Sequence, residues 1–285
     1  QLGANIKHEN AAYELETNGL VGAKIVLPEF SVTATENALM AAVLAKGETI
    51  IKMAAAEPHV EDLINFLIGM GAQIHGAGTH TLKIQGVAKL RGTEHTLIPD
   101  QIEIGTFAVA AAVTRGTVKI NPVVPEHLES VLALLKRIGV PHEVSGDSLT
   151  VNPYTSLKSF KFQALPYPGL PTDLQALFGV LATQCQGTSL IHDPLYEGRL
   201  GYINELVKMG ANAVICDPHR VLITGPTPLY GKEIKSFDLR AGATLLIAGL
   251  VAQGETIINE SEIINRGYEA IDKKLQNLGA KISSL

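Results

Sequence analysis

Residues 238–282 read DLRAGATLLIAGLVAQGETIINESEIINRGYEAIDKKLQNLGAKI and form a complete unit whose outline recurs upstream. A polar opening with Asp238 and Arg240 leads into an apolar, helix-like run that ends at Ala252. A glycine turn, a β-branched segment at 256–258 and a second helical segment with Arg266 follow. The unit ends in LGAKI, and this ending identifies the other copies.

Three further stretches end in the same way. MGANAVI at 209–215, RIGV at 137–140 and MGAQI at 70–74 each close a unit of about 60 residues that contains an apolar run. One such supersecondary unit buries its apolar face against copies of itself. The repeat therefore predicts copies that pack together.

Within a unit the pattern predicts a βαβαββ order: strand, helix, strand, helix and two short strands. Glycines stop the helices, and a polar residue before each apolar run is a plausible N-cap. In the first complete unit, we expect a strand at 24–27, a helix at 36–45 capped by Thr35, a strand at 49–52, an amphipathic helix at 60–70, and a hairpin of 73–75 with 81–85.

The first helix of every unit is apolar on nearly all sides, at 36–45, 107–113, 174–183 and 243–251. A helix without a polar side is buried. Helices clustered inside, with sheets outside them, are therefore expected: an α/β fold of inside-out lobes built from βαβαββ repeats.

The polar segment 86–94 lies outside the repeat pattern and is the expected linker between two lobes. It divides the chain into residues 1–92, the C-terminal part of a first lobe with the tail of one repeat plus one full repeat, and residues 93–285, a second lobe with three repeats. The opening QLGANI, followed by a hairpin-like segment through Tyr13 and Leu15, matches a repeat's tail. The chain is therefore expected to be N-terminally incomplete.

Composition limits the class of protein. The 285 residues are 46% hydrophobic, enough for a sizeable core. A net charge of −5 without basic runs argues against nucleic acid or an anionic membrane surface as the main partner. Cys185 and Cys216 lie in apolar stretches without metal-ligand spacing, which predicts buried thiols in a reducing compartment. No run is long enough to span a membrane, so a cytoplasmic location is expected.

Charged residues next to the apolar helices are the strongest functional signal. Asp173 and Asp238 each come directly before such a helix, where an N-cap is the simpler interpretation. Arg199 and Arg266 occupy equivalent places at the start of the second helix of their units, and a quasi-symmetric lobe would bring them and Arg240 to one cleft. Planar guanidinium donors suit phosphate and carboxylate, although solvated surface pairs are the alternative for any single arginine.

Several of these motifs closely resemble the UDP-N-acetylglucosamine enolpyruvyl transferase (1-carboxyvinyltransferase) family. The resemblance covers the whole chain and rests on LPTDLQA, YEGR, FDLRAGATLLIAG and NRGYEAIDKKLQNLGAKI, with AEPHVEDLINFLIGMGAQI and IPDQIEIGTFAVAAA upstream. It implies a transferase that moves the enolpyruvyl group of phosphoenolpyruvate to the 3-hydroxyl of UDP-N-acetylglucosamine and releases phosphate. That reaction is the first committed step of peptidoglycan synthesis, and with it of cell wall biogenesis, cell shape and cell division. No cofactor and no metal are implied.

The resemblance also implies roles for residues. Asp173 matches the family's general base near the 3-hydroxyl, and Asp238 matches a second active-site carboxylate. Arg199, Arg240 and Arg266 match the arginines that hold the phosphate and carboxylate of phosphoenolpyruvate, Arg266 being counted as catalytic. The sugar nucleotide is expected to meet the turn at Ser31 and Val32, and the backbone of Leu195.

The sequence also departs from the family pattern. Gln101 stands where a basic residue is expected and Gly198 where asparagine usually precedes the arginine, while neither cysteine lies in a loop like that of the family's proton donor. Two alternatives therefore stay open: a truncated, non-catalytic fragment that binds an anion or a nucleotide sugar, and an enzyme like 5-enolpyruvylshikimate-3-phosphate synthase. Self-association through the incomplete first lobe is a further expectation.

Overall fold

The computed structural model describes residues 1–9 and 12–283. It separates into two compact units, each with its own hydrophobic core. Unit 1 comprises residues 1–98 with 166–168, and unit 2 comprises 99–165 with 169–285. The division falls between Ile98 and Pro99, a few residues beyond the predicted boundary after residue 92; the assignment of these parts to lobes and repeats stays a prediction.

Unit 1 contains one succession of elements in the order βαβαββ, from β3 to β6. Its sheet has the order β3-β4-β6-β5, in which β3 and β4 are parallel and the other pairs are antiparallel. The predicted hairpin is confirmed, with β5 at Gln73–His75 and β6 at Thr81–Gln85. The remaining elements are β3 (Lys24–Ser31), α1 (Val32–Ala42), β4 (Glu48–Ala54) and α2 (Pro58–Gly69).

Helix α1 begins earlier than the sequence predicted. Its N-cap is Ser31, whose hydroxyl accepts a hydrogen bond from the Ala34 N–H at 3.2 Å. Thr35, the predicted cap, lies inside the helix, where its hydroxyl donates to the Ser31 carbonyl and accepts from the Ala55 N–H. The prediction that this helix is buried on all sides is also wrong, because the Met40 side chain is 47% exposed.

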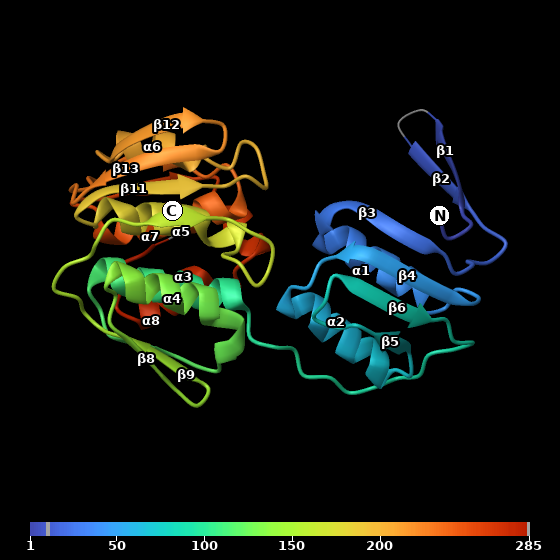
Figure 1. Ribbon diagram of the computed structural model, residues 1–285. Coiled ribbons are helices and arrows are strands. Elements are labelled where there is room, and N and C mark those ends of the chain that lie inside the picture. The colour runs from blue at the N-terminus through green and yellow to red at the C-terminus, as the bar shows by residue number, and fades with distance from the viewer. Residues whose placement is uncertain (10–11, 284–285) are drawn as a thin grey trace. The chain divides into compact units, whose positions relative to one another are not determined.

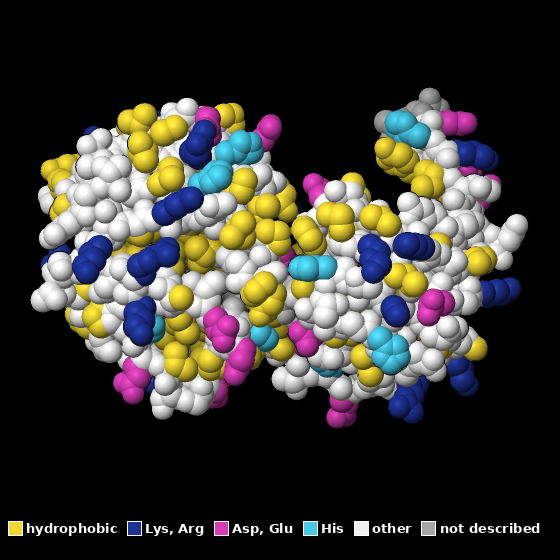
Figure 2. All heavy atoms as spheres, in the orientation of Figure 1, with side chains coloured by type: hydrophobic (Ala, Val, Ile, Leu, Met, Phe, Trp, Pro, Cys, Tyr) yellow, Lys and Arg dark blue, Asp and Glu magenta, His cyan; other side chains and the backbone are white. Residues whose placement is uncertain are grey.

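The first two strands of unit 1 form a separate hairpin, β1 (Asn5–Glu9) with β2 (Ala12–Glu16). Alternation places Ile6, His8, Tyr13 and Leu15 on one face, where the His8 and Tyr13 rings stack at 4.5 Å. Figure 2 shows hydrophobic and histidine side chains together on this hairpin. The apolar face is exposed, since Ile6 and Leu15 are each 65% accessible.

In unit 2 the helices α3, α5 and α7 lie inside and the sheets outside (Figure 1). Within the described residues, the full βαβαββ order appears once in this unit, from β10 to β13; the part before it has no opening strand, and the part after it has no closing pair of strands. The second sheet, β10-β11-β13-β12, has the same strand order and pairing senses as the sheet of unit 1. The other two sheets of unit 2 have fewer strands, in the orders β7-β9-β8 and β14-β15. The predicted fold class, in which sheets enclose buried helices, is therefore confirmed.

The first repeat of unit 2 contains α3 (Gln101–Thr114), β7 (Val118–Ile120), η1 (Pro125–Leu128), α4 (Glu129–Ile138), β8 (His142–Ser145) and β9 (Ser148–Val151). The second contains β10 (Lys161–Gln163), η2 (Thr172–Leu174), α5 (Gln175–Thr183), β11 (Gly187–His192), α6 (Tyr202–Lys208), β12 (Asn212–Asp217) and β13 (Arg220–Gly225). The third contains β14 (Glu233–Lys235), α7 (Leu239–Val251), β15 (Ile257–Asn259), η3 (Ser261–Arg266) and α8 (Ile271–Asn277).

Within residues 1–9 and 12–283, no helix has the length and apolar character needed to cross a bilayer.

Close packing at glycines sets how the three central helices meet their neighbours. A Cβ added at Gly105 of α3 would lie under 3.0 Å from Leu174, and one at Gly179 of α5 under 3.0 Å from the Tyr202 ring. In α7, a Cβ at Gly242 would meet Ser236 and Ile264 in the same way. Because a fully apolar helix has no polar side to orient it, these contacts fix its depth and rotation.

The packing predicts that Gly179→Ala destabilises the protein, although alanine is the better helix former. The added methyl group overpacks against the buried Tyr202 ring, which should lower the free energy of unfolding by about 1–3 kcal/mol. Gly249 of α7 is the matched control, because a Cβ there meets Thr256 only at ordinary contact distance, from 3.4 Å. Gly249→Ala should be neutral or stabilising by up to about 1 kcal/mol. Equal effects in urea unfolding would contradict this account.

Candidate functional site

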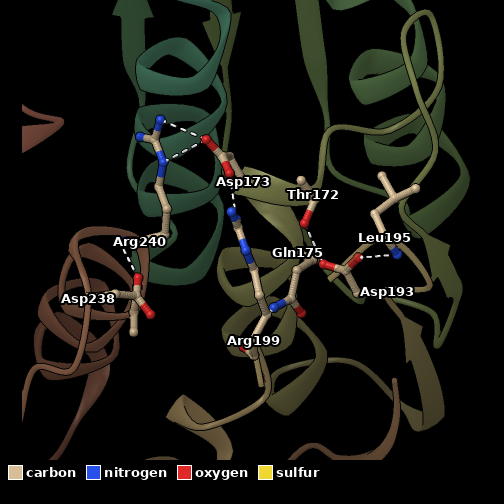
Figure 3. A network of polar contacts seen from close by, with 9 residues as sticks. Thr172, Asp173, Gln175, Asp193, Leu195, Arg199, Asp238 and Arg240 are labelled. Atoms are coloured by element: carbon tan, nitrogen blue, oxygen red, sulfur yellow. Dashed lines mark hydrogen bonds and ion pairs between the residues drawn. The ribbon is translucent and has the colours of Figure 1, made fainter. Parts of the chain in front are cut away.

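Asp173 lies at the centre of a polar cluster in unit 2. It belongs to the short helix η2, which opens directly into α5. No side chain caps this helix start, so the carboxylate is not the N-cap that the simpler interpretation of the sequence suggested. The side chain is 30% exposed, and both of its oxygens accept hydrogen bonds from arginines (Figure 3).

Arg199 reaches Asp173 from the turn that precedes α6. Its Nη1 donates to Oδ1 of the carboxylate at 2.6 Å. The guanidinium also lies over the ring of Tyr196, with its carbon 4.6 Å from the ring centroid. With 32% of its side chain exposed, Arg199 keeps access to solvent and therefore to a ligand.

Arg240 approaches the same carboxylate from the first turn of α7. Its Nε and Nη2 both donate to Oδ2 of Asp173, at 3.0 and 2.9 Å. The guanidinium carbon lies 5.2 Å from the centroid of the Tyr268 ring, and the Tyr268 hydroxyl is hydrogen-bonded to the Thr106 hydroxyl of α3 at 2.9 Å. The third nitrogen, Nη1, is buried, and Tyr268 interacts with the guanidinium as a hydrogen-bonding side chain. Arg240 is thus held on two sides, by Asp173 and by Tyr268.

The two arginines set the protonation of Asp173. Burial alone would raise the pKa of the carboxyl, but the positive charges of Arg240 and Arg199 and their hydrogen bonds hold the pKa below its usual value. The Asp173 charge in turn raises the pKa of Arg240 against the opposing effect of burial. At neutral pH the cluster is therefore one carboxylate between two cations, with a net charge that favours an anion.

The other predicted residues of unit 2 have different partners. Asp238 is the N-cap of α7, and its Oδ1 accepts from the N–H groups of Arg240 and Ala241. The Leu195 N–H donates to Asp193 at 3.1 Å, so this group is already used inside the protein. Arg266 ends η3, is exposed, and makes no ion pair or hydrogen bond within the described chain. Neither Arg199 nor Arg266 opens a helix: both precede α6 and α8 by several residues.

Ser31 and Val32 lie in unit 1, where they form the N-cap and first residue of α1. Their predicted contact with a nucleotide diphosphate stays a prediction. Cys185 is buried as expected, and burial raises the pKa of its thiol to about 12. The prediction for Cys216 is wrong: this residue is exposed, because β12 is the edge strand of its sheet.

Sequence reasoning missed four residues that shape the cluster. Tyr268 and Thr106 support Arg240, while Asp193 and Gln175 contact the segments that carry Asp173 and Arg199. Asp193 and Gln175 are almost fully buried. The sequence offered one signal for them: a polar residue among apolar neighbours is expected to be buried, and a buried polar group requires a hydrogen-bond partner.

Comparison with known proteins identifies the family. The family model described as EPSP synthase (3-phosphoshikimate 1-carboxyvinyltransferase) matches residues 1–275. The UDP-N-acetylglucosamine 1-carboxyvinyltransferase of Halothermothrix orenii is 46% identical over 283 residues, which cover 99% of this chain and 67% of the relative. The chain belongs to the enolpyruvyl transferase family. UDP-N-acetylglucosamine 1-carboxyvinyltransferase 2 of Bacillus subtilis is also 46% identical, over 99% of this chain and 66% of its own length.

Solved structures of enolpyruvyl transferases confirm the predicted fold class. The enolpyruvyl transferase NikO from Streptomyces tendae superposes with a TM-score of 0.91 at 27% identity, covering 99% of this chain and 70% of NikO. EPSP synthase from Acinetobacter baumannii, at 21% identity, shares the fold with a TM-score of 0.75, covering 99% of this chain and 70% of its own. The predicted family and the transferase class are thereby confirmed as well, and the chain spans about two thirds of the length of the curated enolpyruvyl transferases it matches.

The lowered pKa of Asp173 predicts a pH-dependent effect of Asp173→Asn. At pH 7 the substitution leaves two arginines without their carboxylate and should destabilise the protein by about 1–3 kcal/mol. Because the folded-state pKa is lowered, this contribution is complete above the unfolded-state pKa of about 3.9 and is lost as the pH falls through the folded-state pKa. The difference between the two proteins in urea unfolding should therefore shrink from about pH 4 downward.

Asp147 provides the control, because it is exposed in a turn and its carboxylate forms no ion pair within the described chain. Asp147→Asn should have a small effect at every pH. An Asp173→Asn effect that stayed constant from pH 7 to pH 3 would contradict the assigned ion pairs.

Proposed function

We propose that this protein transfers the enolpyruvyl group of phosphoenolpyruvate to the 3-hydroxyl of UDP-N-acetylglucosamine and releases phosphate. The names of relatives that are 46% identical over nearly the whole chain support this activity. The observation that carries it is the arrangement of the Asp173 carboxylate between the guanidinium groups of Arg199 and Arg240, both of which donate to it.

Asp173 is the proposed general base. Its carboxylate is ionised at neutral pH, so it can take the proton of a hydroxyl group as the new carbon–oxygen bond forms. While both oxygens are engaged by guanidinium groups, the carboxylate is a weak base. Transfer of these donors to an anionic substrate would release a lone pair and raise the basicity of Asp173 at the moment it is required.

The arginines are the proposed holders of phosphoenolpyruvate, whose phosphate and carboxylate suit bidentate guanidinium donors. Arg199 and Arg240 lie together at the cluster. Arg266 is exposed and unpaired within the described chain, and we assign it to the same substrate by its place in the NRGYE motif. Their positive charges would stabilise the tetrahedral intermediate that forms between addition and elimination.

The sugar nucleotide is the proposed second substrate, with Ser31, Val32 and Leu195 as its contacts. The Leu195 N–H is held by Asp193, so this residue offers its carbonyl or its side chain, which is 39% exposed. Asp238 caps α7, and its carboxylate is exposed, so a part in proton transfer is compatible with its capping role.

On this proposal the protein acts in the cytoplasm, in peptidoglycan synthesis, and contributes to cell shape and division.

Phosphate release tests the proposal directly. The purified chain is incubated with phosphoenolpyruvate alone, with added UDP-N-acetylglucosamine, or with added shikimate 3-phosphate. Release that requires the sugar nucleotide is expected. Release that requires shikimate 3-phosphate would assign the chain the other acceptor, and binding of phosphoenolpyruvate without release would support the alternative of a non-catalytic anion-binding protein.

Two substitutions separate the proposed roles. Asp173→Asn should lower kcat by about 10²–10⁴-fold, which is the range for loss of a general base. Arg240→Lys should mainly raise the KM for phosphoenolpyruvate, because lysine cannot donate through two nitrogens in one plane. Arg137→Lys is the matched control, since Arg137 is exposed and donates only to the Lys161 carbonyl, away from the cluster. An Asp173→Asn variant with unchanged kcat would exclude Asp173 as the base.

A further inference from the structure

Asp193 is a fully buried carboxylate in unit 2 that makes no ion pair within the described chain. Its Oδ2 accepts a hydrogen bond from the Thr172 hydroxyl, and its Oδ1 accepts from the Leu195 N–H at 3.1 Å. Its backbone N–H donates to the His219 carbonyl at 2.8 Å. Because a buried carboxylate without an ion pair is costly, these hydrogen bonds are what stabilise it.

The contacts of Asp193 connect the two segments that carry the cluster. Thr172 directly precedes Asp173 in η2, and Asp193 opens the loop that leads to Arg199 (Figure 3). At the other end of this loop, the Gln175 side chain donates to the Arg199 carbonyl at 3.0 Å. Gln175 itself accepts a hydrogen bond from the Tyr202 hydroxyl and is only 2% exposed.

The loop 193–199 is therefore fixed at both ends to the four residues 172–175. The ion pair between Arg199 and Asp173 lies between these two attachment points. Without them, the 2.6 Å contact would depend on two partly exposed side chains, and such pairs contribute little to order by themselves. The buried contacts supply the rigidity that the exposed pair lacks.

We propose that Asp193 and Gln175 are positioning residues, which hold the Arg199 guanidinium against the Asp173 carboxylate through the Thr172 hydroxyl and the Arg199 carbonyl. Neither side chain touches the reacting groups, so both act through their neighbours. We call the contacts of Asp193 with Thr172 and of Gln175 with Arg199 the buried frame. Its effect on catalysis rests on the proposed function, but its geometry does not. Misplacement of reacting groups by about 1 Å can reduce rates by about 100-fold, so a frame of this kind has catalytic value.

The pKa of the Asp173 carboxyl, followed by ¹³C NMR, reports the frame without requiring turnover. Arg199 and Arg240 are the charged groups that face this carboxyl. Thr172→Val removes the hydroxyl at nearly constant volume. It should raise the Asp173 pKa towards the value of an ordinary aspartate, because Arg199 moves away. Thr172→Ser should restore the lowered pKa, since serine keeps the hydroxyl.

Further variants separate positioning from other effects. In an Arg199→Ala background, Thr172→Val should cause no additional change, whereas a direct electrostatic effect of Thr172 would persist. Thr188→Val is the matched control, because it removes a similar hydroxyl contact, to Thr224 at 2.9 Å on the exposed side of β11 and β13. Should Thr172→Val fold poorly, Gln175→Met removes the second attachment without leaving a buried charge, and the same pKa change is expected.

An unchanged Asp173 pKa in both Thr172→Val and Gln175→Met would overturn the frame, whatever their activity. If the unmodified chain transfers enolpyruvyl groups, these variants should also lose about 10–100-fold in kcat/KM. An inactive unmodified chain with the expected pKa changes would count against the proposed function alone. The two proposals can therefore fail separately.

Discussion

The burial of three helices that are apolar on every side is the constraint on which unit 2 depends. Such helices must be covered all around, so the sheets lie outside them and the helices pack against one another. Inside these helices the buried polar side chains are threonines such as Thr106 and Thr244, and the charged groups of the cluster lie where the helices begin. Asp173 and Arg240 lie at the starts of α5 and α7, and their contact shows that these two ends meet. The packing of the core thereby determines where the charged cluster forms.

Much of the fold could be predicted from the sequence because the repeat displays the same physical pattern several times. The hairpin of β5 and β6 follows from alternation around a glycine turn, and the burial of α3, α5 and α7 follows from their composition. The start of α1 could not be located in this way. Ser31 and Thr35 are both good caps by residue type, and only the fold decides which hydroxyl meets a free N–H.

The candidate site was predictable only in part. Asp173, Arg199 and Arg240 occupy repeat-related positions, and charge next to an apolar helix marks them in the sequence. The partners that hold them in place are different. Asp193 contacts Thr172 across 21 residues, and Tyr268 contacts Thr106 across 162. Contacts at such separations leave no local pattern, so the buried frame emerges only from the three-dimensional packing.

The position of the Asp173 carboxylate has a consequence for ligand selection. It occupies the donors of Arg199 and Arg240 as an anion would, and it is tethered, so its effective concentration is at least in the range of about 1 mM. An anion that binds these arginines must therefore replace the Asp173 carboxylate as the acceptor of their hydrogen bonds. Small singly charged ions gain little from such an exchange. On the proposed function, a ligand with several anionic groups that is anchored at further points would displace the carboxylate and leave it free to react.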